Sequence, residues 1–187
     1  MGLGLLGGGG ATANWFIRNG AKVAITDQKT EAELESSLKQ LEKDCGKNSF
    51  VFLGEHKTEY FEKRFSDIVA VGPGVPKKNN PFLAVAKKDG VILLNDAVVF
   101  FDNLPKENPI IAITGTRGKT TATSWLAFIL KKKWPEIQAA GNTPENPLLG
   151  ELERLKKYPG TPAVLELSSW QLEYLSQVKR APDIAVI

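Results

Sequence analysis

Residues 110–121 read IIAITGTRGKTT, and this stretch decides the fold. Four apolar residues predict a strand, a glycine-containing loop follows, and Lys119 and Thr120 open an apolar helix expected over about residues 120–132. Glycines at positions 115 and 118 let the backbone pass close to phosphate oxygens, where a side chain would clash. The stretch therefore predicts a phosphate site in which backbone N–H groups and a helix N-terminus face the anion.

The residue types in this loop suit a nucleoside triphosphate with its Mg²⁺. The Lys119 ammonium can reach the β and γ phosphates, and the Thr120 hydroxyl can bind the metal. Ile113 stands where the general pattern has another glycine, so a tight turn with an exposed lysine is the alternative interpretation. The predicted ATP site consists of Thr114, Gly115, Thr116, Arg117, Gly118, Lys119, Thr120 and Thr121.

Strand-like and helix-like segments alternate on both sides of this loop. The predicted strands are 22–26, 49–53, 67–71, 91–94, 110–113, 163–167 and 184–187, and the predicted helices are 12–19, 31–43, 81–88, 120–132 and one that starts near 169. Strands separated by helices predict an α/β fold with mostly parallel sheets. The polar, proline-containing segment at 104–109 places the predicted domain boundary, with one domain at 1–106 and another at 107–187.

Composition excludes several classes of function. The chain has 187 residues, 42% of them hydrophobic, which is enough for a sizeable core, and its net charge of +3 gives no basic face for nucleic acid. A lone cysteine, Cys45, and apolar runs too short for a bilayer predict a cytoplasmic protein without a membrane partner. His56 lies in a polar stretch and is expected to be a solvated loop residue.

A second glycine loop, GLGLLG, occupies residues 2–7, and Asp27 follows at the end of the next predicted strand. Alone, this arrangement favours a dinucleotide and an NAD-dependent oxidoreductase. The match is weak because the strand that should lead into the loop is absent from the sequence. A dehydrogenase also has no use for a second phosphate loop. A non-catalytic nucleotide-binding module is the third hypothesis.

Several segments together resemble the Mur ligase family, most closely its D-glutamate-adding members. They are the TGTRGKT loop at 114–120, the segment LELSSWQLE at 165–173, the Gly141-Asn142 pair, the segment GPGVP at 72–76 and the pair Asn95-Asp96. The resemblance runs from residue 2 to residue 187. It implies a Rossmann-like N-terminal domain followed by the first part of a P-loop ATPase-like central domain.

The resemblance implies an ATP-dependent amide ligase of peptidoglycan precursor synthesis. ATP with Mg²⁺ would convert the carboxylate of UDP-N-acetylmuramoyl-L-alanine to an acyl phosphate, which the amino group of D-glutamate attacks. Lys119, Glu166 and Asn142 would be catalytic, and Thr120 and Glu166 would bind metal. The residues implied to bind the UDP part are Leu5, Leu6, Asp27, Gln28, Gly72, Pro73 and Gly74, and those implied for the muramoyl part are Asn142, Ser168 and Gln171.

Some of these residues have simpler interpretations. Asn142 can be a turn residue after Gly141, and Ser168 can be the N-cap of the helix that follows it. The sequence also stops at residue 187, before the family's metal-binding histidine, its later lysine and its C-terminal domain. We therefore expect an incomplete copy that does not form the amide bond by itself.

Overall fold

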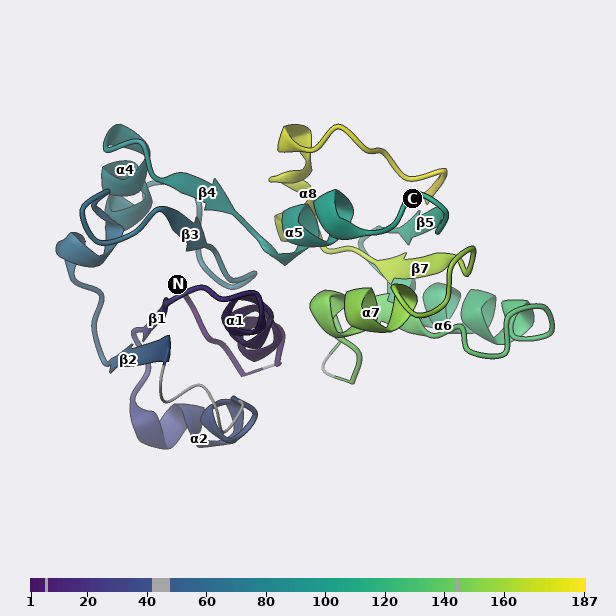
Figure 1. The fold of residues 1–187 in the computed structure, drawn as a ribbon, viewed down its shortest axis with the longest axis horizontal. Helices are drawn as coiled ribbons and strands as arrows, with labels where there is room; N and C mark the ends of the chain where they lie inside the picture. Colours follow the sequence, from purple (N-terminus) through teal and green to yellow (C-terminus); the bar gives the residue numbers. More distant parts are fainter. Residues whose placement is uncertain (6, 42–47, 144) are drawn as a thin grey trace. The chain divides into compact units, whose positions relative to one another are not determined.

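The structure, a computed structural model, describes residues 1–5, 7–41, 48–143 and 145–187. The chain divides into two compact units, Met1–Asp96 and Ala97–Ile187 (Figure 1). Both units combine helices with parallel strands, which confirms the predicted α/β class. Within the described ranges no helix is long and apolar enough to cross a membrane.

The first unit contains two pairs of parallel strands. Its elements are α1 (Gly8–Arg18), β1 (Val23–Asp27), α2 (Glu31–Lys39), β2 (Ser49–Leu53), the 3-10 turn η1 (Thr58–Phe61), β3 (Ile68–Ala70), α4 (Pro81–Lys88) and β4 (Ile92–Leu94). Strand β1 pairs with β2, and β3 pairs with β4. Buried Leu3, Ala13, Ile25 and Leu34 form the core around α1, β1 and α2.

The amino end of the chain is hydrogen-bonded to both strand pairs, and Figure 1 marks it between them. The Gly2 N–H donates to the Thr26 carbonyl of β1 at 2.8 Å. The Met1 ammonium donates to the Ala70 carbonyl of β3 at 3.0 Å, and the Met1 carbonyl accepts from the Gly72 N–H at 2.9 Å. Met1 and Gly2 are therefore the structural link between β1 and β3.

Helix α1 begins four residues before the predicted start at residue 12, so the glycines at 8–10 belong to the helix and do not lengthen the loop. Gly9 packs against the backbone of Leu3, where an added Cβ would lie 2.2 Å from the carbonyl oxygen. Close approach of the helix to the amino-terminal segment, rather than loop flexibility, explains this glycine.

The second unit is built on a four-stranded parallel sheet of order β6-β7-β5-β8. Its elements are α5 (Asp96–Asn103, of which Asp96 ends the first unit), β5 (Ile110–Ile113), α6 (Lys119–Leu130), β6 (Ala139–Gly141), α7 (Leu148–Leu155), β7 (Ala163–Glu166), α8 (Ser169–Leu172), the 3-10 turn η2 (Leu175–Gln177) and β8 (Ile184–Val186). Strand β7 is buried at all four positions and lies inside the sheet between β6 and β5. Such burial on both faces explains its continuous apolar run.

The two compact units meet between residues 96 and 97, whereas the sequence places the domain boundary after residue 106. Arg180 binds the intervening segment to the second unit, because its guanidinium donates to the carbonyls of Leu104 at 2.9 Å and Pro105 at 3.1 Å. Residues 104 and 105 are thus hydrogen-bonded within the second unit. The division into domains at 1–106 and 107–187 stays a prediction.

Candidate functional site

The predicted phosphate loop connects the end of β5 to the start of α6. Gly115 has φ 141° and Gly118, the N-cap of α6, has φ 78°. L-residues with a side chain rarely adopt such angles, which accounts for glycine at both positions. The Thr114 N–H donates to the Val186 carbonyl of β8 at 2.9 Å and so fixes the beginning of the loop. The loop therefore leads into a helix N-terminus, as an anion site requires.

The side chain of Lys119 folds back onto the loop that precedes it. Its ammonium donates to the Gly115 carbonyl at 2.8 Å, and the side chain is half-buried. The next turn of the helix is held by Thr123, whose hydroxyl donates to the Lys119 carbonyl at 2.7 Å. The cation is thereby kept over the loop, where an anion bound to the backbone N–H groups would come within its reach.

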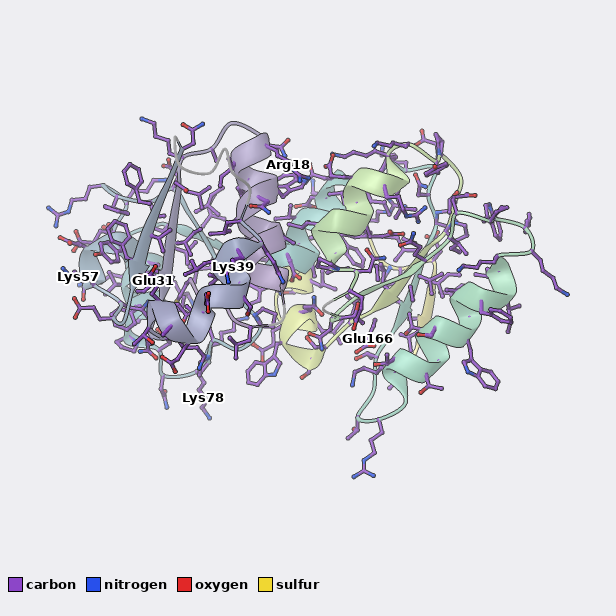
Figure 2. All side chains as sticks on the ribbon, turned by 90° about the horizontal axis from the view of Figure 1, so that it is seen from below. Arg18, Glu31, Lys39, Lys57, Lys78 and Glu166 are labelled. Carbon is purple, nitrogen blue, oxygen red and sulfur yellow. The ribbon has the colours of Figure 1, made fainter. Side chains whose placement is uncertain are left out.

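Thr120 and Glu166 meet directly although 46 residues separate them in sequence. The Thr120 hydroxyl donates to Glu166 Oε2 at 2.6 Å, and Glu166 is 4% exposed. Glu166, labelled in Figure 2, is the last residue of β7. In the sheet it lies opposite Ile113, the last residue of β5. A hydroxyl and a carboxylate are hard oxygen ligands, so this pair fits Mg²⁺. Among the described residues, no group of three or more His, Cys, Asp and Glu side chains gathers as a metal site.

Asn142 lies beside the same carboxylate residue. Its N–H donates to the Glu166 carbonyl at 3.0 Å, and the preceding Gly141 ends β6. Gly141 has φ 132°, and an added Cβ would lie 2.0 Å from the Glu166 carbonyl oxygen. Strands β5, β7 and β6 thus bring Lys119, Glu166 and Asn142, the three predicted catalytic residues, to one edge of the sheet. Asn142 also lies in the loop after Gly141, as the simpler interpretation of this residue predicts.

Ser168 and Gln171 form a capping box at the start of α8, as the alternative interpretation of Ser168 predicts. The Gln171 N–H donates to Ser168 Oγ at 3.3 Å, and the Ser168 N–H donates to Gln171 Oε1 at 3.0 Å. Gln171 is 1% exposed. These contacts hold the chain just after Glu166, and contact of either side chain with the muramoyl group stays a prediction.

In the first unit, Asp27 supports the amino-terminal glycine loop. Its Oδ2 accepts from the Gly4 N–H at 3.1 Å and its Oδ1 accepts from the Lys29 N–H at 2.9 Å. Gly72 also approaches the loop closely, since a Cβ there would be 2.4 Å from the Gly2 carbonyl oxygen. The structure thus brings Asp27 and Gly72 to the same loop.

The other residues implied for the UDP part divide into described and undescribed positions. Leu5 is 53% exposed and Gln28 is exposed, so both are accessible to a ligand. Pro73 and Gly74 follow Gly72 in the turn after β3, where the Val75 N–H donates to the Gly72 carbonyl at 3.0 Å. Leu6 lies outside the described residues, as does Cys45.

His56 differs from its expected place in a solvated loop. It is half-buried, with Nδ1 2.7 Å from the Thr26 hydroxyl, and its ring packs edge-on against Phe61 and Phe82 at centroid distances of 5.9 and 5.3 Å. The aromatic residues that follow it in sequence were the available signal for this burial. The contact places His56 next to the carboxyl end of β1, because its partner Thr26 directly precedes Asp27.

Burial lowers the pKa of His56 below its ordinary value of 6.5. The unfolded chain then binds more protons than the folded chain as the pH falls through 6.5, so stability decreases on acidification until the folded-state pKa is passed. We expect the free energy of unfolding of the unchanged chain, measured with urea, to fall more between pH 7 and pH 5 than that of the His56→Asn variant. Since His56 is the single histidine, identical pH slopes in both proteins would contradict this assignment.

The second unit has the architecture of a P-loop nucleotide-binding protein. Its parallel sheet carries a glycine loop between a strand and a helix, and a carboxylate stands at the end of the adjacent strand. Comparison with known proteins makes the class more specific. Residues 113–187 match the Mur ligase middle domain. The whole chain also aligns with ligases of that type.

Two curated relatives carry the same name. The chain is 42% identical over 187 residues to the UDP-N-acetylmuramoylalanine–D-glutamate ligase of Borreliella afzelii (strain PKo) and 37% identical over 188 residues to that of Roseiflexus sp. (strain RS-1). Each alignment covers 100% of this chain and 38% of the relative. A solved structure of a pseudomurein peptide ligase type C from Methanothermus fervidus is 23% identical, with a TM-score of 0.41, over 86% of this chain and 30% of that one.

Proposed function

We propose that these residues form the nucleotide-binding part of an ATP-dependent ligase that joins D-glutamate to UDP-N-acetylmuramoyl-L-alanine. The observation that carries the proposal is the phosphate loop with Lys119 above it and Thr120 hydrogen-bonded to Glu166. The names of the relatives supply the substrates. Because the chain spans 38% of their length, the activity is proposed for a polypeptide of the relatives' full length that contains these residues.

In the proposed reaction, the substrate carboxylate attacks the γ-phosphorus of ATP and ADP leaves. The amino group of D-glutamate then attacks the acyl phosphate, releasing phosphate and forming the amide. The loop N–H groups bind phosphate oxygens, and Lys119 exchanges its Gly115 carbonyl for oxygens of the β and γ phosphates. This fixed positive charge stabilises the charge that develops during phosphoryl transfer.

Thr120 and Glu166 are the residues that would hold Mg²⁺, which neutralises phosphate charge when it is bound. The Thr120 hydroxyl donates its proton to Glu166 Oε2, so its oxygen lone pairs would remain available to the ion. Asn142, fixed by its N–H to the Glu166 carbonyl, is proposed to orient the muramoyl part. ATP and UDP-linked substrates imply that the reaction takes place in the cytoplasm.

The proposed place of the uridine nucleotide is the glycine loop that Asp27 supports. We expect UDP-N-acetylmuramoyl-L-alanine to bind more tightly than NADH in calorimetric titrations. Asp27→Asn should weaken the binding of UDP-N-acetylmuramoyl-L-alanine, because the Asp27 carboxylate accepts from the Gly4 N–H and holds the loop. Glu31→Gln, an exposed change on α2, is the matched control and should leave both affinities unchanged. Tighter binding of NADH would favour the oxidoreductase hypothesis instead.

A further inference from the structure

The loop between β6 and α7 carries Asn142, and both of its ends are fixed by backbone hydrogen bonds. At the start of the loop the Asn142 N–H donates to the Glu166 carbonyl at 3.0 Å. At its base the Gly141 N–H donates to the Asn146 carbonyl, also at 3.0 Å. Asn142 is exposed, and within the described residues its carboxamide makes no hydrogen bond. The backbone of Asn142 is therefore fixed while its side chain stays available to a ligand.

The side chain of Asn146 anchors the far end of this loop. Its Nδ2 donates to the Ala139 carbonyl of β6 at 3.0 Å and to Glu151 Oε2 of α7 at 3.3 Å. An amide nitrogen carries two hydrogens, so both bonds can form at once. Asn146 thereby connects the loop to the strand before it and to the helix after it.

Glu151 is a buried carboxylate, 0% exposed, in the interior of the second unit. Arg154, one turn further along α7, donates from Nε to Glu151 Oε2 at 2.7 Å and from a terminal nitrogen to Oε1. An isolated buried charge would be destabilising, and this two-point pairing with a guanidinium gives the carboxylate its partner. The oxygen that accepts from Asn146 is therefore held in one place by α7.

We propose that Asn146 and Glu151 are positioning residues for the substrate, because they fix the loop that presents the Asn142 carboxamide. Glu151 is buried and Asn146 Nδ2 is already bonded to two protein oxygens, so both act through Asn142. The inference rests on the proposed function, in which Asn142 orients the muramoyl part. It makes α7, outside the phosphate loop, a determinant of how the muramoyl group is bound.

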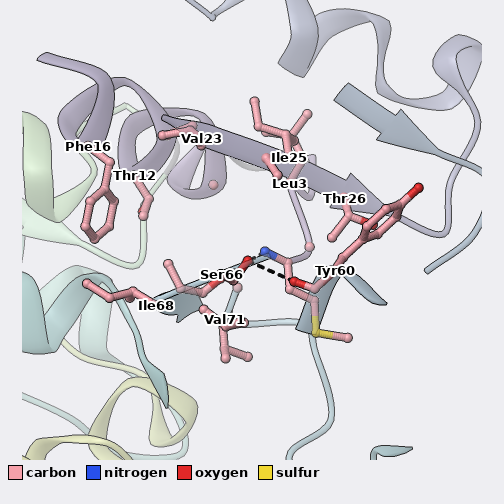
Figure 3. Close-up of a pocket in the computed structure, with 18 of the residues that line it drawn as sticks. Leu3, Thr12, Phe16, Val23, Ile25, Thr26, Tyr60, Ser66, Ile68 and Val71 are labelled. Carbon is pink, nitrogen blue, oxygen red and sulfur yellow. Dashed lines mark hydrogen bonds between the residues drawn. The ribbon is translucent and has the colours of Figure 1, made fainter. Parts of the chain in front are cut away.

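Amide hydrogen exchange tests the anchor without any ligand. Asn146→Ala removes both side-chain bonds, so we expect exchange at the Gly141 amide to become at least about tenfold faster. The matched control is Ser66→Ala, which removes a bond of 2.8 Å to the Tyr60 carbonyl beside a cavity in the first unit (Figure 3). That variant should leave the Gly141 amide unchanged. Unaltered exchange at Gly141 in Asn146→Ala would overturn the proposal.

Calorimetric titration tests the effect on the substrate, with UDP as the ligand that lacks the muramoyl part. Asn146→Ala should weaken binding of UDP-N-acetylmuramoyl-L-alanine by about 3- to 10-fold, which corresponds to one neutral hydrogen bond, and leave that of UDP within about twofold. Because Asn146 acts through Asn142, Asn146→Ala should cause no further loss in a protein that already carries Asn142→Ala. An equal loss in both backgrounds would mean an independent or general effect and would contradict the proposal.

Glu151→Gln extends the test to α7. Its matched control is Glu153→Gln on the same helix, where the Glu153 side chain is 39% exposed and pairs with Lys156. We expect Glu151→Gln to weaken binding of UDP-N-acetylmuramoyl-L-alanine in the same way as Asn146→Ala, and Glu153→Gln to leave it unchanged. If circular dichroism shows that Glu151→Gln does not fold, Asn146→Ala decides the matter alone.

The two possible failures give different results. A loss of affinity in Asn142→Ala with none in Asn146→Ala would overturn this inference and leave the proposed function standing. No loss in Asn142→Ala, or no binding of UDP-N-acetylmuramoyl-L-alanine to the unchanged chain, would reject the proposed role of Asn142 and this inference with it.

Discussion

Lys119→Ala is expected to lower the affinity of the chain for ATP with Mg²⁺ by about 10- to 100-fold, because a hydrogen bond to a charged group contributes roughly 1.5–3 kcal/mol. The alanine cannot replace the ammonium that now lies on the Gly115 carbonyl at the mouth of the loop. Isothermal titration calorimetry measures the effect. The backbone N–H groups of the loop remain, so weak residual binding should persist.

The matched control is Lys131→Ala, which removes the same charge at the other end of α6. Lys131 is exposed and remote from the helix N-terminus, so this substitution should leave ATP affinity within about twofold, a loss that corresponds to less than 1 kcal/mol. Circular dichroism would check that both variants are folded. Equal losses in the two variants would mean that Lys119 acts only through net charge, and no loss in Lys119→Ala would reject the phosphate loop.

Gly141→Ala is expected to destabilise the second unit by about 3–5 kcal/mol or to prevent its folding, because it combines backbone strain with a clash. The residue has φ 132°, and the new Cβ would lie 2.0 Å from the Glu166 carbonyl oxygen and 2.9 Å from the Glu166 nitrogen. Neither of these is a flexible side-chain atom. The strand end that carries Glu166 would have to move, and urea unfolding should show the loss.

Gly150→Ala is the matched control, with an effect of opposite sign. Gly150 lies exposed inside α7, where the nearest atom to an added Cβ is a ring carbon of Pro147 at 3.8 Å. Alanine there should stabilise the helix by about 0.5–1 kcal/mol through its higher helix propensity. Similar stability of Gly141→Ala and the unchanged chain would contradict the close approach of β6 and β7.

The sequence predicts the fold well where apolar periodicity and end signals agree. Strands β2 and β5 and helix α4 have the predicted bounds, and Asn80 caps α4 by accepting from the N–H groups of Phe82 and Leu83. Helices α5 and α7 were not predicted. In α7 the leucines at 148, 149, 152 and 155 have helical spacing, but Gly150 and the adjacent proline obscure it. Strand β6 has only three small residues and depends on pairing with β7.

The chemistry of the candidate site is readable from residue types, whereas its contacts are not. A phosphate loop requires local sequence only, so glycines at 115 and 118 and the helix start at Lys119 could be predicted. The bond from Thr120 to Glu166 depends on the order of strands in the sheet, and so does the contact between Asn142 and Glu166. The burial of His56 depends on rings that are close only in the folded chain.

The central claim is that these residues perform the nucleotide chemistry of a D-glutamate-adding ligase. We would replace the matching segment of the Borreliella afzelii relative, 42% identical, with this chain and measure product from UDP-N-acetylmuramoyl-L-alanine, D-glutamate, ATP and Mg²⁺ by mass spectrometry. The account predicts UDP-N-acetylmuramoyl-L-alanyl-D-glutamate from the chimaera and none when Lys119→Ala is added. A folded chimaera that binds ATP and makes no product, or one that keeps full activity with Lys119→Ala, would contradict the account.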